Sequence, residues 1–537
     1  MTSAQIVNIK NYLRGPYTIG TDVYDVPVPQ GRRLFPGDLV NHSGDVLERK
    51  IPGPIHGVLD LLNRTGQGFT ARGAPLYLFY PLNPSWPPFY ISYKGTSSNN
   101  LLVTIKYEHW QSGVWPRGGV LKVHGPVGNT ALERALLIQT YDTCDKIDTD
   151  VDTPFPPLLD GHLSVTWDTS FNVDPDGSKD IDDIFAWRKL GDGSTEFMIA
   201  IADVSAWIPS NCPIDIRARS LGQTLYDDGA VVTSMLPESI STRSASLRCD
   251  GVVRPVVGRV YTIRDGVVHK TTWQLHTLKL TNCFTYESIL DDESMAAQLY
   301  EYLKTITNMP INPHDSHDWV AQAMIVYNHD AATLLSSSGL GVLRRHASSS
   351  VSQTAYADIA EKSGCDAIRH LGAAAGEYCT GSVSQTNHDG LGLNVYCHVS
   401  SPLRRYADLV NQRVLKYLVF GQTCALDANT MVTTEFVEHL NRRATAAKTL
   451  ERELWFLTHI QPDKISMAEG IVIQCTDSVL NRWSVYVPEW RRKMTGVPCA
   501  DNLLEAGCRV KIRIYCDLRR PNWSERVVCV LSTECRS

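Results

Sequence analysis

The sequence has no apolar run long enough to cross a lipid bilayer. No run in its 537 residues approaches the ~18 uninterrupted apolar residues that a membrane-spanning helix requires. The start, MTSAQIVNIKNYLRG, has no apolar block followed by a cleavage site, so it does not resemble a secretory signal. We therefore expect no membrane partner and an intracellular location, most simply the cytoplasm. A mitochondrial location is the alternative, because Lys10 and Arg14 precede the first acidic residue, Asp22.

Cysteine pairs at metal-binding spacing and an excess of positive charge are also missing. The 14 cysteines include no CxxC pair, and the first 143 residues contain none. This distribution argues against a zinc site and a disulfide framework and favours reduced thiols. Lys and Arg number 51 against 57 Asp and Glu, for a net charge of -6. A surface that binds nucleic acid would therefore have to be a local basic groove.

The hydrophobic pattern predicts an α+β multidomain protein. A chain that is 43% hydrophobic and of this length should form roughly three or four domains of about 150 residues. Short alternating stretches between turn signals predict small β-barrels before residue 145 and after residue 466. Residues 162–275 read as strands and residues 290–460 as mainly helical. Within the latter we expect helices over 403–418, ending at Gly421, and over 430–458.

The segment FNVDPDGSKDIDDIF carries the clearest chemical signal. Asp174, Asp176, Asp180, Asp182 and Asp183 crowd between two strand-like runs, and so many carboxylates repel one another unless cations lie between them. Carboxylate oxygens suit Mg²⁺, or Mn²⁺ as a substitute, and two such ions about 4 Å apart can assist cleavage of a phosphodiester.

Three other interpretations of this segment are open on its residues alone. A calcium loop would need Gly at the sixth position, whereas Gly177 is fourth and Pro175 interrupts the loop. A solvated acidic turn and a single structural metal are the other two. The choice depends on whether groups that bind RNA occur elsewhere in the chain.

Further segments, taken together in their order, resemble the ribonuclease II family, which includes ribonuclease R and the catalytic subunit of the eukaryotic exosome. The acidic segment matches the family signature DxxxxxDxDD with its spacing intact, and IADVSAWI, MLPESIS, SASL and RPV follow in the family's order. LRRH, HDGLGL and YCHVSSPLRRYADLVNQRVL resemble later family segments. The likeness covers about residues 160–460. It implies a central RNB catalytic domain, a mixed β-sheet with packed helices, flanked by OB-type β-barrels.

The resemblance assigns roles to individual residues. It implies metal binding by Asp174, Asp180, Asp182 and Asp183, with Asp180, Asp182 and Arg404 as catalytic residues. RNA binding is implied for Tyr226, which would stack on the 3′-terminal base, and for His346, Arg404, Arg405 and Glu451. From its residues alone, Tyr226 reads as an ordinary turn residue and Arg404 as the partner of a surface carboxylate. Asp176 lies outside the signature and is expected on a solvent-facing loop.

The position of Arg404 can also be argued from local sequence. Ser401 is a good N-cap and Pro402 a good first helical residue, which would place Arg404 in the first turn of the next helix. A guanidinium there adds to the positive end of the helix, a suitable place for a phosphate.

Domain boundaries follow from the same resemblance. We expect a truncated or remodelled cold-shock-like region over 1–49, a second cold-shock-like barrel over 50–145, the RNB domain over 146–465 and an RNA-binding OB barrel over 466–537. Gln412 stands where the family usually has His, and no aromatic residue closely follows LRRH.

The predicted function is a 3′-to-5′ hydrolytic exoribonuclease that degrades single-stranded RNA to nucleoside 5′-monophosphates with two Mg²⁺ ions, acting as a monomer. The alternative is a catalytically inactive RNA-binding regulator on the same fold. A calcium-dependent structural protein is a third, more distant reading. The four signature aspartates and Arg404 favour the enzyme.

Overall fold

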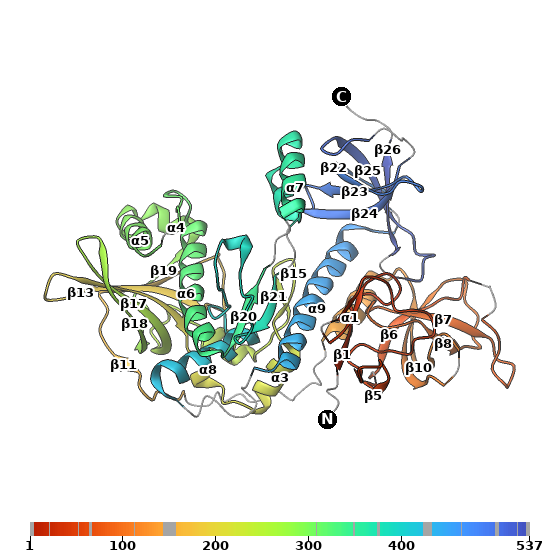
Figure 1. Ribbon diagram of the computed structural model, residues 1–537, viewed down its shortest axis with the longest axis horizontal. Coiled ribbons are helices and arrows are strands. Elements are labelled where there is room, and N and C mark those ends of the chain that lie inside the picture. Colours follow the sequence, from red (N-terminus) through yellow and green to blue (C-terminus); the bar gives the residue numbers. More distant parts are fainter. Residues whose placement is uncertain are drawn as a thin grey trace. The chain divides into compact units, whose positions relative to one another are not determined.

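The computed structural model describes residues 5–20, 22–51, 53–63, 67–111, 113–142, 157–307, 309–346, 350–372, 376–422, 432–462, 464–499, 504–522 and 525–532. The chain divides into two compact units (Figure 1), which are described separately. The first unit comprises residues 1–142, 349–372 and 449–537, and the second comprises 143–348 and 373–448. In the described ranges, no helix is both long and apolar enough to span a membrane.

The N-terminal part of the first unit is built from two β structures that share one core. A five-stranded sheet has the order β3-β2-β1-β4-β5, and a closed barrel has the order β10-β8-β7-β6-β9. Alternate residues of these strands point inward, and the fully buried rings of Phe35, Phe79 and Phe89 lie in the shared core. The elements are β1 (Gln5–Ile9), β2 (Tyr17–Ile19), β3 (Asp22–Tyr24), β4 (Leu39–Val40), β5 (Val46–Glu48), β6 (Ile55–Leu59), β7 (Leu76–Pro81), β8 (Phe89–Ser92), β9 (Leu101–His109), β10 (Arg117–Pro126) and α1 (Thr130–Tyr141).

The rest of the first unit is a five-stranded sheet in the order β24-β23-β22-β25-β26, which confirms the β structure expected after residue 466. Its strands are β22 (Ser466–Asp477), β23 (Arg482–Val487), β24 (Arg492–Pro498), β25 (Arg509–Cys516) and β26 (Val527–Ser532). Helix α7 (Ser350–Ser363) and the 3-10 turn η2 (Asp366–Gly372) pack on this sheet through Ile359 and Ile368, which contact Ile471 and Tyr486. The predicted boundaries between the four regions stay predictions.

The second unit is organised around a seven-stranded mixed sheet in the order β11-β18-β17-β14-β13-β12-β19. The pairs β12–β19 and β11–β18 are parallel, and the other neighbours are antiparallel. The strands are β11 (Leu163–Ser164), β12 (Thr169–Asp174), β13 (Asp183–Lys189), β14 (Thr195–Ala202), β17 (Arg254–Arg264), β18 (Val267–Leu278) and β19 (Asn282–Thr285).

Helices cover one face of this sheet. Phe185, Phe197 and Ile199 alternate onto that face, where they join buried side chains of α5 (Glu293–Ile306) and α6 (Ser316–Ser338) in the main core. Figure 1 shows both helices beside the sheet. The remaining elements of the unit are α2 (Val204–Trp207), α3 (Pro213–Leu221), β15 (Leu225–Asp227), β16 (Ala230–Thr233), the π-helical turn η1 (Ile240–Ser244), α4 (Tyr286–Asp291), α5 (Glu293–Ile306), α6 (Ser316–Ser338), β20 (Val342–Arg345), β21 (Glu377–Thr380), η3 (Asp389–Leu391) and α8 (Tyr406–Phe420). The predicted α+β fold with several sheets and a closed barrel is confirmed.

The two predicted long helices are confirmed, but the start of the first one was wrong. Helix α8 ends at Gly421 as expected, with the left-handed φ of 67° that favours glycine, and α9 spans Thr434–His459. However, α8 begins at Tyr406 rather than at Pro402. Arg405 has extended backbone angles and forms an antiparallel bridge with Gln223, so the helix cannot start before it. Arg404 therefore lies in the turn that precedes the helix.

Candidate active site

The signature aspartates lie where two neighbouring strands of the large sheet meet a connecting loop. Asp174 is the last residue of β12 and Asp183 the first residue of β13. Ser246 fixes the loop between them, because its hydroxyl donates to the Lys179 carbonyl at 2.7 Å and accepts from the Ile181 amide at 3.0 Å. The carboxylates are thus held by the ends of two interior strands and by a hydrogen-bonded loop. Asp176, outside the signature, is exposed as predicted.

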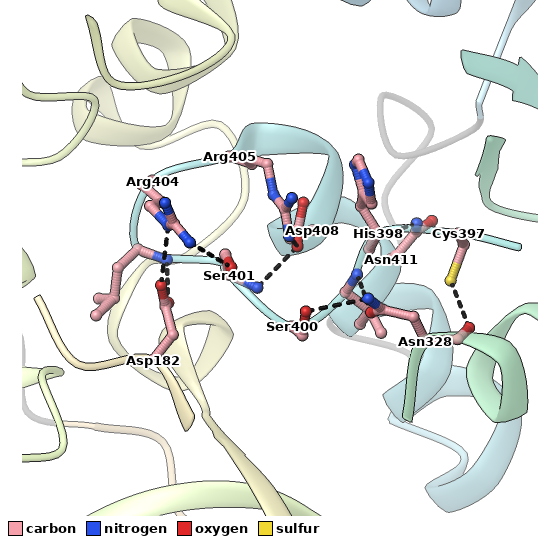
Figure 2. A network of polar contacts seen from close by, with 12 residues as sticks. Asp182, Asn328, Cys397, His398, Ser400, Ser401, Arg404, Arg405, Asp408 and Asn411 are labelled. Carbon is pink, nitrogen blue, oxygen red and sulfur yellow. Dashed lines mark hydrogen bonds and ion pairs between the residues drawn. The ribbon is translucent and has the colours of Figure 1, made fainter. Parts of the chain in front are cut away.

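A second loop, residues 397–405, brings cationic groups to the aspartates (Figure 2). Two buried asparagines hold it. The Asn328 side chain donates to the Ser400 hydroxyl at 3.1 Å and accepts from the Val399 amide at 3.0 Å. Asn411 donates to the His398 carbonyl at 2.8 Å. These contacts fix the path of the backbone immediately before Arg404.

Arg404 and Asp182 meet at the end of this loop. The Asp182 carboxylate accepts a hydrogen bond from the Leu403 amide at 2.9 Å, and its other oxygen lies 3.6 Å from Nε of Arg404 (Figure 2). The Asp182 side chain is 5% exposed, whereas that of Arg404 is 48% exposed. The guanidinium therefore has one side toward the buried carboxylate and another open to solvent, where a phosphate could approach.

Arg405 points to a different partner. Its guanidinium donates to Asp408 at 2.8 Å, and the same carboxylate oxygen accepts from the Ser401 amide at 2.8 Å. Burial lowers the pKa of Arg405, but Asp408, Tyr378 and Asp182 together raise it above its usual value. In this arrangement Arg405 holds the loop to the first turn of α8, and its predicted contact with RNA stays a prediction.

Burial makes the aspartate cluster costly to ionise. It raises the pKa of Asp182 to about 7, although Arg404 and the Leu403 amide lower it. Burial, followed by the charges of Asp174 and Asp182, raises the pKa of Asp183 well above its usual value. Burial also raises the pKa of Asp174, against a hydrogen bond from Asn172, and the Asp180 carboxylate adds to this rise. Asp174 and Asp182 thus disfavour the charged form of Asp183, and Asp180 disfavours that of Asp174.

Tyr226 lies beside the same cluster. It sits in β15, which pairs with β16 across a turn at Asp228 and Gly229, both with positive φ. Burial raises the pKa of Tyr226, Arg404 lowers it, and Asp180 and Asp182 raise it, so the tyrosine lies within electrostatic range of all three side chains. The structure therefore brings Tyr226, Arg404 and the aspartates together.

A short backbone junction links the Tyr226 hairpin to the Arg404 turn. The Thr224 amide donates to the Arg404 carbonyl at 2.9 Å, and the Tyr406 amide donates to the Gly222 carbonyl at 2.9 Å. Gln223 and Arg405 form the bridge between these two bonds.

The two other predicted RNA contacts lie elsewhere. His346 is 8% exposed, its Nδ1 accepts from the Gly390 amide at 3.1 Å, and its ring stacks on His388 with centroids 5.2 Å apart. Glu451 is exposed on the C-terminal part of α9, which belongs to the first unit. Glu453, two residues on, is 6% exposed and pairs with Arg452 at 2.8 Å. RNA contacts by His346 and Glu451 stay predictions.

Two residues of the site were missed from sequence. Tyr286, at the start of α4, has a pKa raised to about 12 by burial and by the charges of Asp174 and Asp183, so it lies within electrostatic range of the cluster. No local pattern marks this tyrosine. Asn172 donates to Asp174 at 2.9 Å, and its position two residues earlier on the same strand could have indicated this, because such residues share a face.

The carboxylates offer oxygen ligands for a divalent cation, although their side chains are not already arranged as a metal site. Among the residues that the structure describes, no three His, Cys, Asp or Glu side chains stand in a metal-holding arrangement. Yet Oδ2 of Asp183 is buried without a hydrogen-bond partner, and so is Oδ1 of Asn172. Unpaired buried oxygens beside mutually repelling carboxylates are stabilised by a cation. The donor set is all oxygen, which fits Mg²⁺ or Mn²⁺ rather than a softer metal.

Over the region that contains this site, the chain is similar to known proteins. A family model described as the RNB domain matches residues 165–297 and 289–421. Exoribonuclease 2 of Edwardsiella piscicida is 24% identical over 376 residues, which cover 55% of this chain and 56% of that protein. Exoribonuclease 2 of Yersinia pestis (strain Pestoides F) is 26% identical over 349 residues, 51% of this chain and 53% of that protein. The chain contains an RNB domain over residues 165–421. The resemblance inferred from the ordered segments is thereby confirmed.

Solved structures agree on the fold of this RNB protein. RNase R of Mycoplasma genitalium, in complex with ribose methylated single-stranded RNA, has a TM-score of 0.71 and 16% identity, covering 99% of this chain and 100% of that one. Yeast Ssd1, described as a pseudonuclease, has a TM-score of 0.69 and 15% identity, covering 95% of this chain and 81% of that one. At these identities the likeness establishes the fold alone. The RNB chain spans about half the length of the curated relatives it matches.

Proposed function

We propose that this RNB protein is a divalent-metal-dependent exoribonuclease that hydrolyses single-stranded RNA from its 3′ end and releases nucleoside 5′-monophosphates. The observation that carries the proposal is the meeting of Asp182 with Arg404, 3.6 Å apart, beside the other signature aspartates and Tyr226. A buried anionic cluster with an adjacent half-exposed guanidinium is an arrangement suited to phosphoryl transfer.

The aspartates would hold the metal. Asp174, Asp180, Asp182 and Asp183 supply oxygen ligands for Mg²⁺, with Mn²⁺ as a substitute, and their side chains would turn toward the ions on binding. When bound, two such ions supply activation of the attacking water and neutralisation of charge on the leaving oxygen. The raised pKa of Asp182, about 7, means that metal binding also has to displace a proton near neutral pH.

The chain's own groups position the RNA end. Arg404 is open to solvent on one side, so its guanidinium can bind the scissile phosphate and stabilise the charge that develops there. Tyr226, on the neighbouring hairpin, would stack on the terminal base and thereby set which phosphodiester lies at the aspartates. Base stacking tolerates every base, so little sequence preference is expected.

Single-stranded RNA is the proposed substrate. RNase R of Mycoplasma genitalium, which shares the fold of this chain, is in complex with ribose methylated single-stranded RNA in its solved structure. The exoribonuclease 2 relatives carry the activity in their names. We propose that the chain acts on this substrate as a monomer.

The second candidate function is RNA binding without cleavage. The likeness to yeast Ssd1, a pseudonuclease, favours it, because the same fold exists in a protein described as inactive. Against it stands the complete set of four signature aspartates together with Arg404 in this sequence. An inactive protein would have no need to keep carboxylates that are costly to bury.

One assay separates the two functions. The purified protein is incubated with a 5′-labelled single-stranded RNA and Mg²⁺, beside Asp182→Asn and a sample with chelator. We expect the wild type alone to shorten the RNA progressively, and a blocked 3′ end to prevent this. Tight RNA binding without shortening would favour the regulator. Shortening of an RNA with a blocked 3′ end would show that the proposed polarity is wrong.

A further inference from the structure

Two histidines meet at one threonine hydroxyl on the closed barrel of the first unit. Nδ1 of His56 lies 2.8 Å from Oγ1 of Thr104, and Nε2 of His124 lies 2.6 Å from the same oxygen. The centroids of the two imidazole rings are 6.3 Å apart, and their planes make an angle of 70°. Both contacts are hydrogen bonds, so two imidazole nitrogens are directed at a single oxygen atom.

Three neighbouring strands of the barrel bring these side chains together. His56 belongs to β6, Thr104 to β9 and His124 to β10, and β9 pairs with both of the other strands. His56 and Thr104 are direct partners in the ladder between β6 and β9. Because Val103 and Ile105 belong to the core, Thr104 between them points to the outer face of the barrel. The sheet itself therefore holds the three residues in one row.

This row is partly shielded from water. Thr104 is 7% exposed, and both imidazoles are half-buried. Burial lowers the pKa of His56, and the neighbouring His124 lowers it further. Burial and then the charge of Lys122 lower the pKa of His124. Both imidazoles are therefore neutral near pH 7, which is the form in which histidine binds metal ions.

The spacing of the three donor atoms matches a right-angled coordination shell. Ligands at right angles, with bonds of about 2.0 Å, lie about 2.8 Å apart, whereas tetrahedral ligands lie about 3.3 Å apart. The nitrogen–oxygen separations in the barrel are 2.8 and 2.6 Å. Ni²⁺ and Cu²⁺ favour tetragonal shells of nitrogen and oxygen, whereas Zn²⁺ favours tetrahedral ones. The row therefore suits the first two ions.

We propose that His56, Thr104 and His124 bind a divalent metal ion that prefers a tetragonal shell, Ni²⁺ or Cu²⁺. The two imidazole nitrogens would be the main ligands, the hydroxyl a weaker third, and water would complete the shell. The side chains would tilt so that their lone pairs meet at the ion instead of at the hydroxyl oxygen.

Metal binding also requires a proton to move within one ring. The Thr104 hydroxyl has one proton and can donate only one of the two hydrogen bonds, so a ring nitrogen donates the other. When the ion binds, that proton passes to the other nitrogen of the same imidazole, which stays neutral. The site would exist whether or not the chain cleaves RNA.

Calorimetric titration of the full chain with Ni²⁺, in a buffer with millimolar Mg²⁺ to occupy the aspartates, tests the site. We expect the wild type to have one site whose affinity falls at least about tenfold in His56→Gln and in His124→Gln. Glutamine can still hydrogen-bond to Thr104, so the far-ultraviolet circular dichroism should not change. Zn²⁺ should bind more weakly than Ni²⁺. One equivalent of Cu²⁺ should give an electron paramagnetic resonance spectrum split by two nitrogens.

Two further variants serve as controls. His109→Gln removes an exposed imidazole of the same barrel and should leave the Ni²⁺ affinity unchanged. Lys122→Gln removes the cation that is paired in register with Thr104, and it should raise the affinity several-fold at low salt. The proposal is overturned if the wild type binds no Ni²⁺, if Zn²⁺ binds more tightly, or if the His56 and His124 variants bind Ni²⁺ as well as the wild type does.

Discussion

Replacing Asp182 by asparagine should stabilise the metal-free protein above neutral pH, even though it should abolish RNA cleavage. In the folded protein the Asp182 carboxyl is buried and its pKa is raised from 3.8 to about 7. The folded state therefore binds this proton more tightly than the unfolded chain does. As the pH rises from about 4 to about 7, the proton is lost and the folded state loses stability relative to the unfolded one.

The size of this effect follows from the shift in pKa. About three pKa units correspond to roughly 4 kcal/mol at 1.36 kcal/mol per unit. Asparagine has no ionisable group. It keeps an oxygen that can accept a hydrogen bond from the Leu403 amide, as the Asp182 carboxylate does at 2.9 Å. Its NH₂ would face the Arg404 guanidinium, donor against donor, and this offsets part of the gain. We expect a net stabilisation of roughly 2 to 4 kcal/mol at pH 8, and little difference at pH 4.

Urea unfolding followed by tryptophan fluorescence, in chelator and at several values between pH 4 and pH 8, measures the difference between the two proteins. Adding Mg²⁺ in place of the chelator provides a second comparison of the two proteins. At 100 times its dissociation constant a ligand of the folded state adds about 2.7 kcal/mol, so Mg²⁺ should stabilise the wild type and much less the variant. Asp176→Asn, at the exposed acidic position of the same loop, is the matched control and should change neither quantity.

The reasoning would be refuted if Asp182→Asn were less stable than the wild type in chelator at pH 8, or if the difference did not depend on pH. Either result would mean that the carboxylate is favourably solvated in the metal-free protein.

Further substitutions test the other groups. Arg404→Ala should lower the rate of RNA cleavage by roughly 10² to 10³-fold in single-turnover kinetics, because it removes one stabiliser of transition-state charge, and equal rates would exclude that role. Tyr226→Ala should weaken binding of single-stranded RNA by about 1 to 3 kcal/mol in a titration with an inactive background, whereas Tyr226→Phe should retain the affinity. Asp408→Ala should destabilise the protein by about 3 to 5 kcal/mol in urea, because it leaves the largely buried Arg405 unpaired, and a neutral result would contradict the loop-holding role.

Much of the local structure around the site could be predicted from sequence. The apolar runs on both sides of the acidic segment predicted strands, and Asp174 and Asp183 do end β12 and begin β13. Gly421 ends α8 as predicted, because few other residues adopt its left-handed backbone at low cost. These features depend on neighbours in the chain, which a sequence displays directly.

The rest depends on partners that are distant in sequence. A good N-cap and a proline predicted a helix from Pro402, but pairing of Arg405 with Gln223 overrides that local preference. The proximity of Arg404 to Asp182 was inferred only through the family resemblance, and Tyr286 at the cluster was not foreseen. The buried asparagines Asn328 and Asn411, which hold the Arg404 loop, likewise carry no local signal.

The junction between the Tyr226 hairpin and the Arg404 turn has a consequence for any attempt to redesign this protein. Thr224 bonds to Arg404, and Gly222 to Tyr406, so the two segments share backbone bonds and shift as one body. A transplanted hairpin would carry the arginine with it, and an altered turn would move the tyrosine. If Tyr226 binds the last base and Arg404 the phosphate, as proposed, a redesign would have to change both binding functions together.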